Sequence, residues 1–325
     1  MNKIKIFLFQ LLEKMANFFG KMGITAKTLG VLKIYNFFFR ESWPYGDIIE
    51  VQGSKMYVNI KNASYRMRKT FEAYAQNKIH ERATTELFKK IVKEGDNVVD
   101  LGANIGYFTL LAAKIVGPQG KVFAFEPEPK NYNYLQKNIK LNNYENVTAL
   151  QKAVSDKNGK TKLYICDYDT GHHTIRQYSG IEAYSRGRHT EEKSIEIETV
   201  TLDEFFKGKE ELIDVIKIDV EGAEALALTG MEGILRTNKN LKMFVEFFPL
   251  LIRKIGNSPE EFIRKLLEDY NFSISVIPED YDAQKGEMIK INNVNDIRGL
   301  CPSEESHINL FLEHNGSSKI NPEEN

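Results

Sequence analysis

A chain of 325 residues is long enough to bury a large hydrophobic core, as one large domain or two small ones. Its 44 basic and 45 acidic side chains leave a net charge of −1 and form no long basic run, so nothing indicates a nucleic-acid partner. The two cysteines, Cys166 and Cys301, lack a Cys-x-x-Cys spacing, which argues against a disulfide framework or zinc site and favours a reducing, cytoplasmic compartment.

Residues 1–45 are predicted to form an amphipathic helical segment. Apolar residues recur at helical spacing between Ile4 and Met22, with lysines among them. The uninterrupted apolar run is shorter than the roughly 20 residues that a membrane-spanning helix needs, and no small-residue cleavage site follows it. We expect a helix that either packs against protein or lies on a membrane surface through residues 3–22, which would make a cytoplasmic protein peripheral at the membrane.

The segment 46–314 is predicted to form the main domain, and it opens with a β-hairpin over residues 46–62. Two short β-type runs, 48–51 and 56–60, are joined by a Gly-Ser turn. The last residues, 315–325, are polar and are predicted to be a disordered tail.

Beyond the hairpin, apolar strands and helical segments alternate along the chain. Capping sequences after Thr201 and Ser258 open two of the helices, and Pro129 suits the first turn of another that ends near Asn142. This alternation predicts a doubly wound α/β sheet. The expected strands are 97–99, 121–125, 147–154, 195–200, 215–219, 243–246, 273–277 and 308–312.

The most informative stretch is Asp100-Leu101-Gly102-Ala103-Asn104-Ile105-Gly106, which lies between a strand and a helical pattern. Its glycines let the backbone approach a ligand closely, and the new helix offers unpaired N–H groups. The next strand ends in Glu126, where a carboxylate typically accepts the hydroxyls of an adenosine ribose. This pattern predicts an enzyme that binds a nucleoside cofactor.

The turn favours S-adenosylmethionine over a nicotinamide dinucleotide. A nicotinamide site usually has a third glycine, and none follows Gly106 here. Asp100 would repel a pyrophosphate, whereas it could pair with the ammonium of a methionine moiety. Because S-adenosylmethionine carries an ammonium and a sulfonium but no phosphate, acidic strand ends such as Asp100 and Asp219 suit it. The alternatives are a nicotinamide-dependent oxidoreductase and a non-catalytic protein that keeps the fold.

Five motifs follow one another along the chain: 100–106, Phe125-Glu126-Pro127, Ala153-Val154-Ser155-Asp156, Thr201-Leu202-Asp203 and 218–224. In their order and spacing, residues 80–250 resemble the FkbM family of S-adenosylmethionine-dependent methyltransferases. The resemblance implies a class I methyltransferase fold, with a Rossmann-like sheet of seven strands whose last strand is antiparallel. It also implies O-methylation of a hydroxyl on a sugar, glycan, lipid-linked or natural-product acceptor.

Carried over position by position, the resemblance implies a set of cofactor-binding residues. This chain departs from many family members at Ile79-His80-Glu81, where they carry a Tyr-Glu pair, so we assign that helix no cofactor role. The methionine and ribose end of the cofactor site would be shaped by Asp100, Gly102, Ala103, Asn104 and Gly106. Glu126, beside Pro127, would bind the ribose hydroxyls. The adenine would lie against Ala153 and Val154, and Asp219 would lie near the methyl group.

An alcohol acceptor must lose its proton as it attacks the methyl group, so a histidine or carboxylate is expected nearby. The candidates are Asp219, Glu246, and His172 and His173 in the polar stretch 155–195. We predict that one of the two imidazoles approaches the methyl-bearing side of the crevice, with Asp219 beneath it. Alternatively, Asp219 caps a helix, Glu246 is a buried carboxylate paired to backbone, and the histidines lie in a solvated loop.

A metal ion is not expected. Asp219, Glu221 and Glu224 could hold Mg²⁺, but acidic residues in the first turn of a helix are also favoured by the helix dipole. The predicted partner is a small-molecule or glycan acceptor, and the sequence assigns no oligomeric state.

Overall fold

The computed structural model describes residues 11, 47–60, 63, 65–166, 173–175, 193–278, 287–299 and 306–315. The predicted amphipathic segment 1–45 (apart from Leu11), His172 and the predicted tail beyond Asn315 lie outside these residues. The chain divides into two compact units, Met1–Lys78 and Ile79–Asn325. No helix in the described ranges combines the length and the apolar character that crossing a bilayer requires.

The described part of the first unit confirms the predicted hairpin. Strands β1 (Ile48–Val51) and β2 (Ser54–Tyr57) pair antiparallel, and helix α3 (Tyr65–Ala75) follows them. The two residues between the strands, Gln52 and Gly53, have φ values of 51° and 76°. Positive φ at both positions is the turn geometry that matches the twist of two paired strands.

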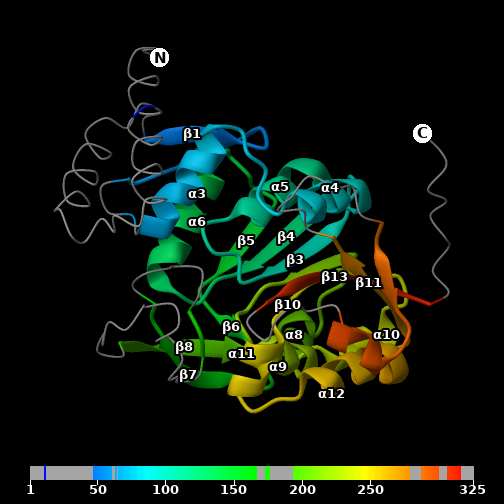
Figure 1. Cartoon of the computed structure of the whole chain (residues 1–325). Helices are drawn as coiled ribbons and strands as arrows, with labels where there is room; N and C mark the ends of the chain where they lie inside the picture. The colour runs from blue at the N-terminus through cyan, green and yellow to red at the C-terminus, as the bar shows by residue number, and fades with distance from the viewer. Residues whose placement is uncertain are drawn as a thin grey trace. The chain divides into compact units, whose positions relative to one another are not determined.

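The second unit is built on an eight-stranded sheet (Figure 1). Its strands are β3 (Asn97–Leu101), β4 (Lys121–Phe125), β5 (Val147–Leu150), β9 (Val215–Ile218), β10 (Lys242–Phe247), β11 (Phe272–Ile277), β12 (Ile289–Ile291) and β13 (Ile308–His314). The spatial order is β12-β11-β13-β10-β9-β3-β4-β5, and β13 lies antiparallel between β10 and β11. Seven of these strands form the predicted class I methyltransferase sheet with its last strand antiparallel, and the short edge strand β12 is an addition.

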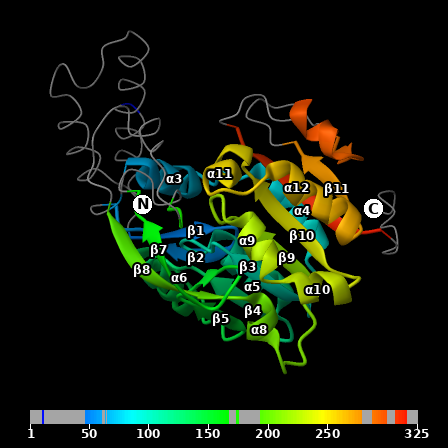
Figure 2. The same ribbon diagram turned by 90° about the horizontal axis from the view of Figure 1, so that it is seen from below.

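Helices cover both faces of this sheet. They are α4 (Arg82–Ile91), α5 (Tyr107–Val116), α6 (Pro129–Leu141), α8 (Leu202–Phe206), α9 (Glu224–Thr229), α10 (Glu232–Thr237), α11 (Pro249–Lys254) and α12 (Pro259–Arg264), the last continued by a π-helical turn, Lys265–Asp269; a 3₁₀ segment, Val294–Gly299, precedes β13. Figure 1 shows α4 and α5 on one side and α8, α9 and α12 on the other, and Figure 2 shows the second group from below. The predicted N-caps are confirmed, because the Thr201 and Ser258 hydroxyls accept from Glu204 N and Glu261 N.

Alternation along the strands separates the apolar core from the polar site. Val99, Ile216 and Val245 point into the large core cluster beneath α8, α9 and α12. The residues next to them in sequence therefore point to the opposite face, under α4 and α5. There Lys217 Nζ lies 4.6 Å from the centroid of the Phe108 ring, so the sheet places its charged side chains on the α5 side.

The predicted strand 147–154 is wrong as a single element. Residues Val147–Leu150 form β5 at the edge of the main sheet, whereas β6 (Ala153–Val154) pairs in parallel with β8 (Ser194–Val200). Together with β7 (Gly159–Tyr164), these form a separate three-stranded sheet. Only two polar residues separate the apolar residues of β5 from those of β6. The sequence pattern therefore does not indicate that the chain passes from one sheet to another.

Candidate active site

The glycines of the 100–106 turn are required by the packing of the protein itself. Gly102 has a φ of +80°, and a side chain there would overlap the backbone carbonyl of Asp219. Gly106 has a φ of +101°, and an added Cβ would lie 2.8 Å from Leu135 Cδ1. The turn therefore packs tightly against the residue that follows β9 and against α6.

Glu126 holds this turn through backbone hydrogen bonds. Its Oε2 accepts from Asn104 N at 2.8 Å and its Oε1 accepts from Glu128 N at 2.9 Å. Burial raises the pKa of Glu126 to about 8, although these two bonds favour the ionised form. Beside it, Asn104 Oδ1 is buried without a hydrogen-bond partner within the described part of the chain. A buried acceptor with no donor is the feature that a bound polar ligand would satisfy.

Lys217 is the positive centre of the site. Its side chain is 4% exposed, and Nζ donates to Asp219 Oδ2 at 3.0 Å. Burial alone would raise the pKa of Asp219, but Lys217 and hydrogen bonding with Glu246 outweigh it and lower that pKa to about 2. In the β3–β9 register, Asp100 lies opposite Lys217 and accepts from Thr109 Oγ1 at 2.6 Å. Burial raises the pKa of Asp100, despite the attraction of Lys217.

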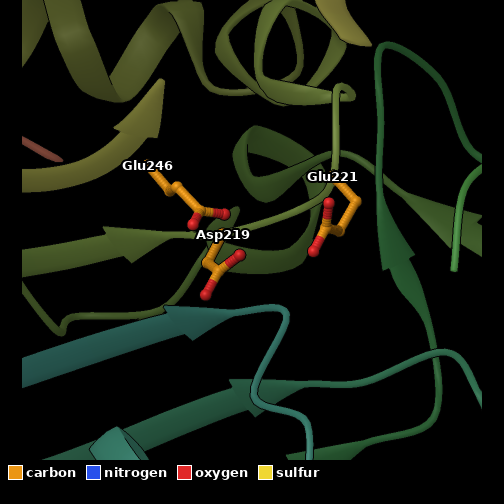
Figure 3. Close-up of side chains that lie close together, drawn as sticks. All are labelled: Asp219, Glu221 and Glu246. Atoms are coloured by element: carbon orange, nitrogen blue, oxygen red, sulfur yellow. The ribbon is translucent and has the colours of Figure 1, made fainter. Parts of the chain in front are cut away.

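The side chains of Asp219, Glu221 and Glu246 converge at the carboxyl ends of β9 and β10 (Figure 3). One oxygen of each lies within 4.8 Å of the others. Burial, with repulsion from Asp219 and Glu221, raises the pKa of Glu246 well above its ordinary value. The raised pKa of Glu246 and the lowered pKa of Asp219 favour placing a proton on Glu246, in the hydrogen bond that the two carboxyls share. Lys217 and this proton offset the negative charge of the group from within the protein.

Glu224, which the sequence grouped with Asp219 and Glu221, has a different environment. Its Oε1 accepts from Gly222 N at 3.0 Å, and the residue is 1% exposed. Glu246 takes its place in the group of three. That the site needs no metal ion stays a prediction.

The structure brings His80 and Glu81 to this site. The sequence did not predict a role for these two residues. His80 Nε2 lies 3.1 Å from Glu81 Oε1, and Asn309 Nδ2 donates to Glu81 Oε2 at 3.4 Å. Burial would raise the pKa of Glu81, but attraction to Lys217 and His80 lowers it. Glu81 has a φ of 41°, and Asn104 and Glu221 both have a φ of 50°. Non-glycine residues held in the left-handed region are a feature of functional sites.

A second pair of histidine and carboxylate is formed by His307 and Glu246. His307 Nε2 is 3.4 Å from Glu246 Oε1, and the two side chains are 40% and 15% exposed. The ring also lies 5.8 Å from that of Phe248, centroid to centroid. His307 directly precedes β13, and nothing in its sequence neighbourhood distinguishes it.

The remaining predicted site residues lie in other surroundings. His173 Nδ1 accepts from the backbone N–H of Cys166 at 3.0 Å, which puts the proton of the neutral ring on Nε2. Ala153 packs with Leu163 and Ile197, and Val154 joins the main core. Pro127 is half-buried between Glu126 and Glu128. The structure therefore brings together Asp219, Glu246 and Asp100 around Lys217, and Asn104 beside Glu126.

The unfolding free energy of the cofactor-free protein is expected to fall as pH rises from about 4.5 to about 8. Burial raises the pKa of Glu126 to about 8 and that of Glu224 to about 7, from 4.5 for both. Between the lower and the raised values the folded state binds more protons than the unfolded state, so stability falls as pH rises, by up to about 1.4 kcal/mol per pH unit for each group. Urea denaturation across this range checks it, with Glu126→Gln expected to flatten the slope. A rise in stability with pH would contradict these protonation states.

The sheet order and the turn after β3 define a class I methyltransferase fold. The chain belongs to the FkbM family of methyltransferases, because the Methyltransferase FkbM domain matches residues 100–274, more than half of its length. This match confirms the family indicated by the five motifs.

Relatives share this domain at moderate identity. Methyltransferase sdnD of Sordaria araneosa is 33% identical over 156 residues, which are 42% of this chain and 60% of sdnD. Hexuronic acid methyltransferase AglP of Haloferax volcanii is 28% identical over 158 residues, 48% of this chain and 59% of AglP. The chain thus spans about three fifths of the length of these relatives. The crystal structure of a methyltransferase FkbM from Methylobacillus flagellatus gives a TM-score of 0.39 at 13% identity, covering 76% of this chain and 53% of that one.

Proposed function

We propose that the protein is an S-adenosylmethionine-dependent methyltransferase that methylates a hydroxyl oxygen on a sugar, glycan, lipid-linked or natural-product acceptor. The observation that carries this proposal is the unpartnered Asn104 Oδ1 beside Glu126, next to a group of carboxylates. Acceptor atoms and negative charge suit a ligand that brings hydroxyl and ammonium donors and no phosphate. A dinucleotide would place its pyrophosphate at this turn, close to Asp100.

The cofactor-binding residues predicted from the sequence fit S-adenosylmethionine. Asn104 and the second lone pairs of the Glu126 carboxylate would accept its ribose hydroxyls or ammonium. Asp100, Gly102, Ala103 and Gly106 would shape the turn around it, with Pro127, Ala153 and Val154 toward the adenine. When bound, the cofactor supplies a methyl group on a sulfonium, which an acceptor oxygen can displace.

Asp219 is proposed to position the acceptor. An ionised carboxylate that Lys217 holds in place can accept a hydrogen bond from the acceptor hydroxyl and fix its direction of attack. Glu246, with its proton shared toward Asp219, fixes that carboxylate from the other side. The predicted role of His172 or His173 as the base stays a prediction, and His173 would first have to release the N–H of Cys166.

The relatives support a small acceptor with hydroxyl groups. AglP is named as acting on hexuronic acid, an acidic sugar. The nicotinamide-dependent oxidoreductase and the non-catalytic protein are the competing functions, and membership of a methyltransferase family argues against both.

Methyl-labelled S-adenosylmethionine, incubated with panels of sugars, glycans, lipid-linked sugars and hydroxylated natural products, tests this function. We expect label in a base-stable ether on at least one acceptor class, and its loss with Asp219→Asn. Transfer only to nitrogen, carbon or a carboxyl group, the last recognised by its release in mild base, would contradict O-methylation of a hydroxyl.

A further inference from the structure

The carboxylates near Asp219 are poorly suited to take a proton from an acceptor hydroxyl. Asp219 is a weak base, because Lys217 and its other partners lower its pKa to about 2. The pKa of Glu246 is raised well above its ordinary value, which favours its protonated form, and Glu81 forms an ion pair with His80 and is attracted by Lys217. A group with an available lone pair must come from another residue.

His307 is such a group. His307 Nε2 lies 3.4 Å from Glu246 Oε1, and a neutral imidazole with its proton on Nε2 carries its lone pair on Nδ1. Glu246 can face this N–H while it shares a hydrogen bond with Asp219. The side chain of His307 is 40% exposed, so a proton taken up by the ring has a route to water.

We propose that His307 accepts the proton of the acceptor hydroxyl during methyl transfer, oriented by Glu246. This assignment rests on the proposed function. As the acceptor oxygen bonds to the methyl carbon, the electron pair of the sulfur–methyl bond stays on sulfur and the hydroxyl proton passes to His307 Nδ1. The imidazolium then loses that proton to water, which restores the neutral ring.

Several charged side chains lie around His307 or behind the carboxyl that it contacts. Glu246 on β10 faces the ring directly. Behind Glu246 lie Asp219 on β9 and Glu221, with Glu81 on the α4 side, and Lys217 is the opposing positive charge.

The experiment follows the histidine rings by NMR as pH is varied, with saturating S-adenosylhomocysteine or S-adenosylmethionine and with EDTA to exclude cations. The two ligands differ by one methyl group and one positive charge. A ring about 6 Å from the sulfonium should have its titration midpoint lowered by about 0.5 to 2 pH units with S-adenosylmethionine, for an effective dielectric constant between about 80 and 20. His307→Gln identifies the resonance and should keep S-adenosylhomocysteine affinity within about twofold.

His314 is the matched control, because it ends β13, which His307 directly precedes, and so lies seven residues on, about 23 Å away at roughly 3.3 Å per residue. It should respond identically to both ligands. The assignment would be overturned if the titration midpoint of His307 were the same with both ligands. It would also be overturned if the midpoint of His173, and not that of His307, differed between them. Failure of both ligands to bind would overturn the proposed function itself, which separates the two results.

Discussion

Replacing Lys217 with methionine is expected to lower the free energy of unfolding by about 3 to 5 kcal/mol at neutral pH. The ammonium is buried, pairs with Asp219 at 3.0 Å and also attracts Asp100 and Glu81. Without it, a buried carboxylate has no positive partner. It must then bind a proton or become exposed to water through local opening of the structure. Urea denaturation measures this loss. The slope of the unfolding free energy against urea concentration should be the same as in the wild type.

Lys160→Met is the matched control for this change. Lys160 forms an ion pair with Glu196 at 2.6 Å, but both side chains are well exposed, at 64% and 65%. Exposed pairs contribute little to stability because water screens them, so this variant should be nearly as stable as the wild type. The double change Lys217→Met with Asp219→Asn should recover part of the loss. A Lys217→Met protein as stable as Lys160→Met would contradict the charge balance described here.

Replacing Glu126 with glutamine is expected to weaken S-adenosylhomocysteine binding and the fold together. At pH 9, where Glu126 with its pKa of about 8 is mostly ionised, loss of one charge-assisted hydrogen bond to the ribose corresponds to about 1.5 to 3 kcal/mol, or roughly a tenfold to more than a hundredfold weaker affinity. Both carboxylate oxygens also accept backbone N–H groups, from Asn104 and Glu128, and an amide NH₂ cannot accept from one of them. The free energy of unfolding should therefore fall by about 1 to 3 kcal/mol without cofactor.

Calorimetry and denaturation of the same preparation separate the two effects. Glu198→Gln is the control, because Glu198 is 57% exposed and pairs with Lys152 on the surface. It should change neither quantity measurably. If Glu126→Gln lost stability but kept its affinity for S-adenosylhomocysteine, Glu126 would hold only the turn and not the ribose.

The main sheet could be predicted because its strands carry strong local signals. Val215–Ile218 and Lys242–Phe247 are short apolar runs that each meet an acidic residue at or near their carboxyl end. Strand β12 could not be predicted, because it is three residues long and two of them are exposed. The change of sheet after β5 was equally invisible, since it depends on pairing with the distant strand β8.

The site was predictable only in part. Asp219 and Glu246 could be predicted as site residues from their positions at strand ends. Lys217 could also have been predicted, because a lone lysine in an apolar strand must find a buried partner. His307 meets Glu246 only through the antiparallel register that puts Asn309 opposite Glu246. Asn309 in turn reaches Glu81, far away in sequence. Such contacts arise from tertiary pairing, which local patterns do not encode.

Calorimetric titration of the purified protein with S-adenosylhomocysteine, NAD and NADP in parallel tests the central claim most directly. The turn with its hydrogen-bond acceptors and the acidic strand ends predict micromolar binding of S-adenosylhomocysteine, which corresponds to a binding free energy of about 7 to 9 kcal/mol in magnitude. Both dinucleotides should bind much more weakly. Tighter binding of NAD or NADP than of S-adenosylhomocysteine would contradict the account.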